Sequence, residues 1–307
     1  MRGLPPRIVY IAGYGHSGST LLNIILGQHP DAMGAGELFR LAGPAWRSGE
    51  LCSCGEPLQS CPVWREIVRR WEGEAGSGAM AAYRELQAIC ESRRPWQPRR
   101  ADRDAYGRLS LGLFAAIREV TGKPVIVDSS KLPARAAALA RVPGLDLRVL
   151  HLVRDGRGVA WSLRRRMAKD LQAGLQAAKR QRSALRTGLM WMLANLATER
   201  TARGLAPGRA MRLRYETLVA EPVESLTRVG ELAGLDMRGL AASLAAGGSL
   251  APGHVMAGNR LRMAGTLSLR ADSEWQRLLP AGQRRLIEGL CLPVMRRYGY
   301  PPLAGAS

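Results

Sequence analysis

The chain has 307 residues, of which 46% are hydrophobic and 23% charged, so it can form a globular core and is neither disordered nor collagen-like. Its 45 basic residues exceed its 25 acidic residues by 20, and all but four of the basic residues are arginine. Guanidinium groups bind phosphate and sulfate well, so the charge predicts an anionic ligand. With 5% aromatic residues and no base-reading motif, specific nucleic-acid recognition is not indicated, but an arginine-rich polyanion-binding protein remains an alternative.

An uncharged stretch at residues 8–30 has the length of a signal peptide or a membrane span. Its centre, residues 13–20, is rich in glycine and hydroxyl side chains and contains a histidine, which a bilayer would exclude. Five cysteines in 307 residues are not typical of a disulfide-rich secreted module. We therefore expect a cytoplasmic protein without a membrane span; the oligomeric state stays open.

Short apolar runs alternate with helical patterns along the chain. Strands are predicted at residues 8–12, 124–128, 147–153 and 210–215. Helices are predicted at residues 17–28, from about residue 156, and at residues 222–232. Strands that alternate with helices form a parallel sheet with helices on both faces, so we predict a single α/β domain over residues 1–307. Residues 42–104 are expected to form an α-helical, cysteine-containing insertion or lid within it.

The loop after the first predicted strand has the sequence Gly-Tyr-Gly-His-Ser-Gly-Ser-Thr at residues 13–20. Between a buried strand and a helix, its backbone N–H groups can converge on an anion at the positive end of the helix dipole. The residues expected to bind the anion are Gly15, His16, Ser17, Gly18, Ser19 and Thr20. The loop fits the nucleotide-binding pattern except that Ser19 stands where the phosphate-binding lysine is expected. This departure weakens the alternative of a P-loop kinase that uses ATP and Mg²⁺, with Asp128 as the metal-binding carboxylate.

A second candidate anion site follows the strand at residues 147–153. Arg154 stands at the strand end, Ser162 lies eight residues later, and Arg166 follows Ser162 by one helical turn. A guanidinium and a hydroxyl at this spacing can hold one phosphate. Two anion sites on neighbouring strand ends predict a ligand that is phosphorylated at two places.

Together the two motifs resemble those of sulfotransferases that use 3′-phosphoadenosine 5′-phosphosulfate (PAPS). The loop at residues 13–20 is similar to the family's 5′-phosphosulfate loop, and residues 154–162 are similar to its 3′-phosphate motif. Residues 214–218 and 254–262 carry further similarity. The resemblance implies a P-loop NTPase-like parallel sheet, PAPS as sulfuryl donor and adenosine 3′,5′-bisphosphate as product. It implies an acceptor hydroxyl or phenol on a saccharide, natural product or peptide.

The same resemblance assigns roles to further residues. The segment from His29 to Glu37 and the Arg-Asp-Gly-Arg sequence from Arg154 are most similar to the carbohydrate and tyrosylprotein branches, together with bacterial relatives. In those branches a glutamate at the position of Glu37 is the general base, a role that requires the loop after the first helix to fold over the cleft. Lys131 corresponds to a basic residue that contacts the sulfuryl group or the acceptor. The adenine or the phosphates are expected near Tyr215, Asn259, Arg260 and Arg262.

His16 departs from the family pattern, which has lysine or arginine at this position. An imidazole carries a positive charge only when both nitrogens are protonated, and a neighbouring phosphosulfate favours that form. We expect His16 to act as a cationic donor to the bridging oxygen. A weakened or redirected activity is the alternative.

Three of the five cysteines, Cys52, Cys54 and Cys61, fall within ten residues. Tetrahedral zinc needs four ligands, and no fourth is evident nearby, although Cys90 and His29 are candidates to approach in space. The sequence leaves open whether these cysteines are thiols, a disulfide or a metal site. No metal is expected in the reaction itself.

Overall fold

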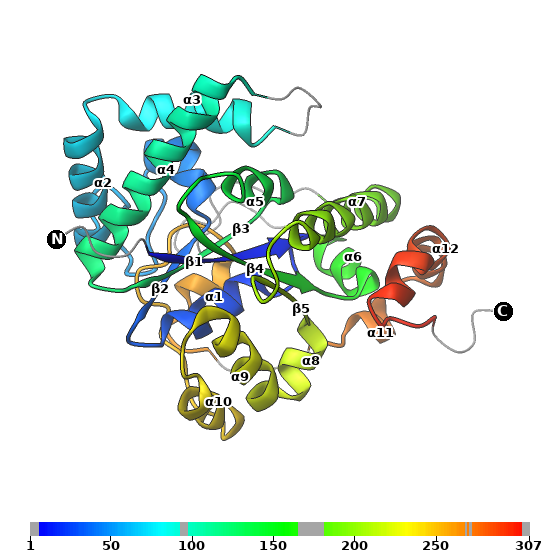
Figure 1. The fold of residues 1–307 in the computed structure, drawn as a ribbon. Coiled ribbons are helices and arrows are strands. Elements are labelled where there is room, and N and C mark those ends of the chain that lie inside the picture. The colour runs from blue at the N-terminus through cyan, green and yellow to red at the C-terminus, as the bar shows by residue number, and fades with distance from the viewer. Residues whose placement is uncertain (1–5, 93–97, 165–180, 268, 270–271, 303–307) are drawn as a thin grey trace.

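The computed structural model describes residues 6–92, 98–164, 181–267, 269 and 272–302. Its centre is a five-stranded sheet in the order β2-β3-β1-β4-β5, and each neighbouring pair of strands is parallel (Figure 1). The strands are β1 (Arg7–Gly13), β2 (Ala32–Gly36), β3 (Val125–Lys131), β4 (Asp146–Val153) and β5 (Ala210–Arg214). The predicted α/β fold is confirmed, and the four strands predicted from sequence are present.

Helices cover both faces of the sheet (Figure 1). One face carries α1 (Ser19–Gly27), α8 (Tyr215–Ala220), α9 (Pro222–Ala233) and α10 (Arg238–Ala245). The other carries α4 (Arg100–Thr121), α5 (Pro133–Leu139) and α7 (Ala184–Arg203), with α2 (Pro62–Ala75) and α3 (Ala79–Cys90) against α4. At one end, α6 (Gly156–Arg164) and α12 (Ala281–Arg297) pack against α7, and α11 (Trp275–Leu278) packs against α6. Within the described ranges, no helix has both the length and the apolar character to span a membrane.

The apolar runs become strands because both of their faces are buried. Along β1, Ile8 and Tyr10 enter one hydrophobic cluster, whereas Val9 and Ile11 enter the cluster on the opposite face. All four are fully buried. A central parallel strand therefore has an unbroken apolar sequence. Polar residues that follow its carboxyl end can then lie in a site at the edge of the sheet.

The sequence pattern does not predict the strand β2. Its residues, Ala32–Gly36, are expected in a loop after the first helix. The segment Ala-Met-Gly-Ala-Gly has weak strand propensity, but it pairs with β3 at the edge of the sheet and packs against α1. A side-chain carbon at Gly34 would lie 2.6 Å from the carbonyl oxygen of Asn23, so only a glycine permits this approach. The Asn23 side chain accepts a hydrogen bond from the Gly36 N–H at 3.1 Å, which fixes the strand end before Glu37.

The segment between β2 and β3 is helical, as expected for the insertion. It begins with the short turns η1 (Leu38–Arg40) and η2 (Leu41–Ala45) and continues through α2, α3 and α4. The expected limit at residue 104 falls inside α4, which ends at Thr121. Trp64, Trp71 and Phe114 lie in the same hydrophobic cluster as β1, so the insertion packs directly on the sheet.

Candidate functional site

A cavity of about 500 Å³ lies at the carboxyl ends of β1, β3 and β4, where open α/β sheets bind their ligands. It is bordered by the loop between β1 and α1, by α6 and by the end of β3. The late residues that border it are Gly258, Asn259, Leu261, Leu267 and Asp272. The sequence-predicted residues that line it are Gly15, His16, Gly18, Ser19, Thr20, Glu37, Lys131, Arg154, Ser162, Tyr215 and Asn259. Side chains that are far apart in the sequence thus line the same cavity.

The loop between β1 and α1 presents the positive end of a helix to this cavity. Gly18 caps α1 with φ 90°, and His16 has φ 66°, a left-handed conformation that is rare outside glycine. No acidic residue lies in the first turn of α1, so the helix dipole is not neutralised there. Ser17, which the sequence predicted at this site, is buried and does not line the cavity, and its hydroxyl has no hydrogen-bond partner among the described residues.

The two predicted anion sites are in direct contact. His16 Nδ1 lies 2.8 Å from Ser162 Oγ on α6, and Arg154 Nη1 donates to the His16 carbonyl oxygen at 3.2 Å. One ligand with two anionic groups can therefore touch both motifs.

Arg154 is held at the end of β4 by several contacts. Its guanidinium lies 4.8 Å from the centre of the Tyr215 ring and forms an ion pair with Asp272 at 2.8 Å. The Arg154 side chain is 6% exposed, whereas that of Asp272 is 40% exposed. The Arg154 Nε atom has no hydrogen-bond partner among the described residues. An incoming anion would compete with Asp272 for a guanidinium that is already oriented.

The Glu37 carboxylate and the Lys131 ammonium group face each other at the cavity. Lys131 Nζ forms an ion pair with Glu37 Oε1 and also donates to the Ser129 carbonyl oxygen at 3.1 Å. Glu37 directly follows β2, and its backbone N–H donates to the Met256 carbonyl oxygen at 3.1 Å. The side chains of Glu37 and Lys131 are 14% and 18% exposed. This pair offers a proton acceptor and a cation within reach of a bound molecule.

The sulfotransferase family matches residues 6–239 of the chain. This chain belongs to the sulfotransferase family. Human carbohydrate sulfotransferase 2 is 29% identical over 201 aligned positions, which take in 53% of this chain and 37% of the relative. The mouse protein of the same name is 28% identical with the same coverage. The match therefore spans little more than a third of these relatives.

Two solved structures share the fold of this chain. The sulfotransferase domain of the Synechococcus PCC 7002 olefin synthase has a TM-score of 0.50 and 19% identity, covering 94% of this chain and 96% of that domain. Sulfotransferase STF9 from Mycobacterium avium has a TM-score of 0.50 and 10% identity, covering 97% of this chain and 78% of the other. The P-loop NTPase-like fold expected from the sequence is thereby confirmed.

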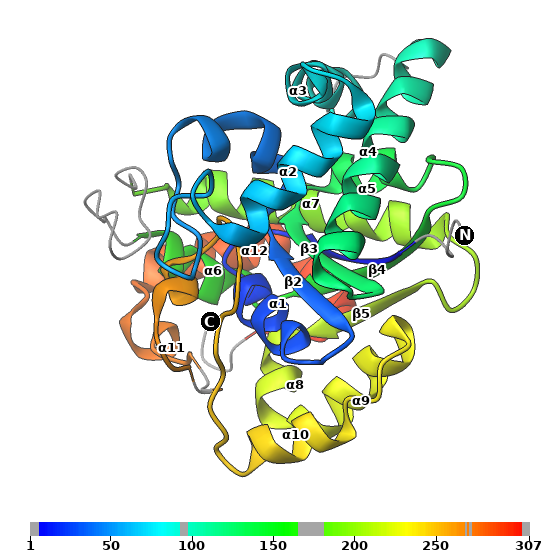
Figure 2. The same ribbon diagram turned by 90° about the vertical axis from the view of Figure 1, so that its left-hand side faces the viewer.

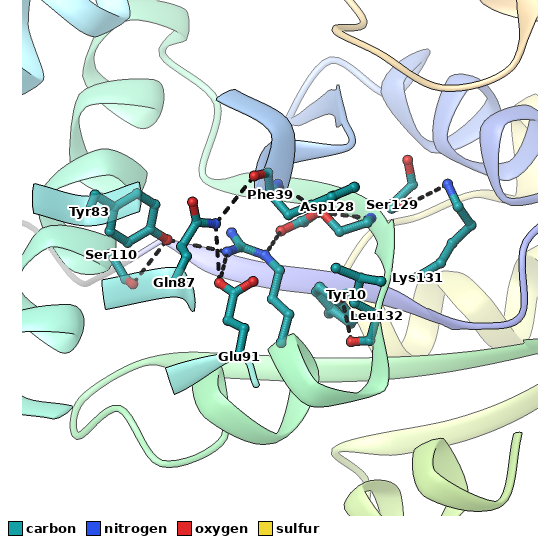
Figure 3. Close-up of polar contacts among 12 residues, drawn as sticks. Tyr10, Phe39, Tyr83, Gln87, Glu91, Ser110, Asp128, Ser129, Lys131 and Leu132 are labelled. Carbon is teal, nitrogen blue, oxygen red and sulfur yellow. Dashed lines mark hydrogen bonds and ion pairs between the residues drawn. The ribbon is translucent and has the colours of Figure 1, made fainter. Parts of the chain in front are cut away.

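Asp128 shapes the end of β3, which carries Lys131 (Figure 3). Its fully buried carboxylate accepts a hydrogen bond from the Ser130 N–H at 2.9 Å and another from the Ser130 hydroxyl. The other carboxylate oxygen accepts from Arg135 Nε at 3.0 Å, and Arg135 also pairs with Glu91. This occupied carboxylate does not line the cavity, which contradicts its interpretation as a magnesium ligand. Lys131 itself has φ 68°, the left-handed conformation.

The late segment, by which we mean the described residues from His254 to Asp272, borders one side of the cavity. Only some of its residues make the nucleotide contacts expected from the sequence. The Asn259 N–H donates to Thr20 Oγ1 at 3.2 Å, which brings Gly258 and Asn259 over α1. Arg260 is exposed and does not line the cavity. Arg262 is fully buried and pairs with Glu50 at 3.2 Å, so its expected nucleotide contact is wrong.

Two further arginines concern the predicted 3′-phosphate motif and the cavity. Arg166 lies outside the described residues, as do the other basic residues of 165–180. Arg182 lines the cavity and donates to the Tyr14 hydroxyl at 3.4 Å. The sequence motifs singled out neither Arg182 nor Asp272, because their places at the cavity depend on the fold.

Proposed function

We propose that this sulfotransferase transfers the sulfuryl group of PAPS to a hydroxyl group of a saccharide or another small molecule. One observation carries the proposal: two contacting anion sites and a carboxylate-ammonium pair line the same cavity. The saccharide is supported by the names of the carbohydrate sulfotransferases that the chain matches. A phenol or a peptide tyrosine is a less supported acceptor.

The donor's two anionic ends would bind the two contacting motifs. The loop at residues 15–20 supplies the helix N-terminus and the hydroxyls of Ser19 and Thr20 for the phosphosulfate. Arg154 and Ser162 would hold the 3′-phosphate, with Asp272 leaving the guanidinium. Tyr215 and Asn259 border the space left for the nucleoside.

Glu37 would take the proton of the acceptor hydroxyl as the acceptor oxygen forms its bond to sulfur. The bond between sulfur and the bridging oxygen breaks in the same process, and the electron pair stays on adenosine 3′,5′-bisphosphate. Charge spreads over the moving group and the leaving oxygen, so positioned cationic donors lower the barrier. Lys131 would turn from Glu37 toward the sulfuryl group, and a protonated His16 would donate to the bridging oxygen. This exchange would also free the carboxylate to accept its proton.

The kinase alternative receives less support from the site. Ser19 replaces the expected lysine, and Asp128 is occupied by Arg135 and Ser130. Ser19 therefore supplies no ammonium group to an ATP phosphate, and Asp128 is not free to hold Mg²⁺.

Thermal-shift and calorimetric titrations with adenosine 3′,5′-bisphosphate, PAPS and ATP test the proposal. We expect the bisphosphate and PAPS to stabilise the protein without Mg²⁺. Arg154→Gln should weaken bisphosphate binding by about 10- to 100-fold, the value of a charged hydrogen bond, whereas Arg69→Gln on the exposed face of α2 should not. Transfer of ³⁵S from labelled PAPS to a panel of saccharides would then identify the acceptor. Stabilisation only by ATP with Mg²⁺, or only by polyanions in a salt-sensitive manner, would refute the proposal.

A further inference from the structure

The cysteine-rich segment of the insertion meets a histidine from the late segment. Cys52, Cys54 and Cys61 lie together with His254, and one ligand atom from each side chain is within 4.8 Å of all the others. Cys61 Sγ lies 3.4 Å from His254 Nδ1, and Cys52 Sγ lies 3.8 Å from the same atom. The Sγ atoms of Cys54 and Cys61 are 3.7 Å apart. Two segments separated by almost two hundred residues thus contribute to one group of soft ligands.

Three of the six spacings are close to those of a tetrahedral metal site. Zinc–sulfur bonds of about 2.3 Å and zinc–nitrogen bonds of about 2.0 Å place two sulfurs about 3.8 Å apart and a sulfur and a nitrogen about 3.5 Å apart. A disulfide would instead require a sulfur separation of about 2.05 Å. Three thiolates and one imidazole in this arrangement select zinc over harder ions such as magnesium or calcium. We propose that Cys52, Cys54, Cys61 and His254 bind one structural zinc ion.

The backbone holds the four ligands in place. The turn after Cys52 is closed by the Gly55 N–H, which donates to the Cys52 carbonyl oxygen at 2.9 Å, and Gly55 adopts φ 93°. Cys61 is the N-cap of α2, so the start of this helix fixes its position. Trp64 Nε1 donates to the His254 carbonyl oxygen at 2.8 Å, so the histidine is fastened to the same helix.

The position of the site indicates a structural role. Four protein ligands complete a zinc tetrahedron and leave no open position, and none of the four lines the cavity. Figure 2 shows the late segment beside the segment after β2, and Cys52 pairs with Met256 in an isolated bridge. Gly258 and Asn259 follow within a few residues and border the cavity. The zinc ion would therefore fasten the insertion to the loop that closes over the donor.

Metal analysis of the full chain, purified without chelators from zinc-supplemented cells, tests the proposal independently of sulfuryl transfer. We expect about one zinc ion per chain and X-ray absorption that fits three sulfurs and one nitrogen. His254→Gln and Cys61→Ser should each lose most of the zinc. The matched controls are Cys90→Ser and Cys291→Ser, which alter the two cysteines outside the group and should retain it.

The wild-type measurements keep the proposal testable even if a ligand variant does not fold. Alkylation of the denatured chain in a chelator should modify all five cysteines. Modification of only three, which reveals a disulfide, would overturn the proposal, and so would a wild-type chain that lacks stoichiometric zinc or binds iron instead. Because none of these readings uses PAPS, their failure would leave the proposed sulfuryl transfer unaffected.

Discussion

At the scale of single residues, the ion pair of Glu37 and Lys131 is the chemical centre of the site. Glu37 follows the edge strand β2 and Lys131 is the last residue of the neighbouring strand β3, so the sheet brings the two side chains together from 94 residues apart. Both side chains are mostly buried, which limits their contact with water. Their attraction strengthens as water is excluded, and a ligand that draws Lys131 away changes what Glu37 can do.

Glu37→Gln should abolish proton acceptance while leaving the donor site intact. We expect kcat to fall by about 10²- to 10⁴-fold, the usual contribution of a general base, with little change in the affinity for adenosine 3′,5′-bisphosphate. Steady-state kinetics and calorimetry measure the two quantities separately. Glu66→Gln on the exposed surface of α2 is the control. A full loss of bisphosphate binding in Glu37→Gln would show that Glu37 holds the fold of the site instead.

Asp272→Asn should increase the affinity for the bisphosphate. The Asp272 carboxylate occupies the Arg154 guanidinium, and partly exposed ion pairs of this kind contribute roughly 0.2–1 kcal/mol. Removing this competitor should therefore lower the Kd by about two- to fivefold. Isothermal titration calorimetry at low salt provides the comparison. If the variant binds more weakly, Asp272 orients Arg154 for the ligand instead of competing with it.

At the scale of elements, the loop between β1 and α1 depends on backbone geometry more than on side-chain charge. Gly18 has a left-handed φ, and a side-chain carbon added at Gly18 would collide with the Tyr215 ring. The strand before it and the helix after it are both buried, so the loop cannot relax by shifting either one.

Gly18→Ala should distort this loop. A side-chain carbon at Gly18 would lie 2.5 Å from the Tyr215 ring, and φ 90° is strained for any other residue. We expect a loss of about 1–3 kcal/mol in the free energy of unfolding and at least about tenfold weaker bisphosphate binding. Gly15→Ala is the control for stability, since its added carbon would meet no atom within 4 Å. Equal losses of the free energy of unfolding in Gly18→Ala and Gly15→Ala, measured by urea denaturation, would contradict this account.

Between β4 and α7, a buried histidine makes stability depend on pH. Burial lowers the pKa of His151 to about 4, and its hydrogen bond with Asn195 opposes this shift only in part. The unfolded imidazole titrates near pH 6.5, so between these values the unfolded chain holds more protons and acid favours unfolding. The stabilising effect is complete above about pH 6.5 and is lost as the pH falls toward 4.

His151→Gln should remove this contribution. From pH 7 to pH 5 the wild type should lose about 2 kcal/mol in the free energy of unfolding that the variant does not lose. Urea denaturation at both pH values measures the difference between the two slopes, whatever the starting stability of the variant. Parallel pH profiles would show that His151 does not titrate in this range.

At the scale of the whole molecule, the insertion and the late segment are joined near the cavity. The fully buried ion pair of Arg262 with Glu50 links them, and the Cys52–Met256 bridge lies beside it. Glu50 also pairs with Arg40 at 2.9 Å, so its carboxylate would keep one cationic partner if Arg262 were removed.

Arg262→Met should destabilise the fold by about 1.5–3 kcal/mol, the value of a charged hydrogen bond, seen as a lower urea midpoint. Adding Glu50→Gln should not restore the loss, because Arg40 then loses its carboxylate partner as well. Arg238→Met is the control, since Arg238 and Asp236 are mostly exposed and their pair should be worth at most about 1 kcal/mol. A similar loss in both variants would show that burial of Arg262 is not the cause.

Much of the fold was predictable from local chemistry along the chain. Buried parallel strands produce unbroken apolar runs, and the glycine-rich loop lies directly between one such run and a helix, so neighbouring residues reveal the anion-binding motif. The Arg154 to Ser162 spacing is likewise contained within one strand end and its helix. These features do not depend on which distant segment packs against them.

Three-dimensional packing was needed for everything that depends on distant partners. β2 forms because β3 and α1 accept its small residues, and Arg262 is withdrawn from the cavity because Glu50 is buried beside it. Asp272 and His254 join their neighbours only through the late segment. Burial and ion pairing are properties of the assembled interior, so residue type and spacing cannot predict them from the sequence.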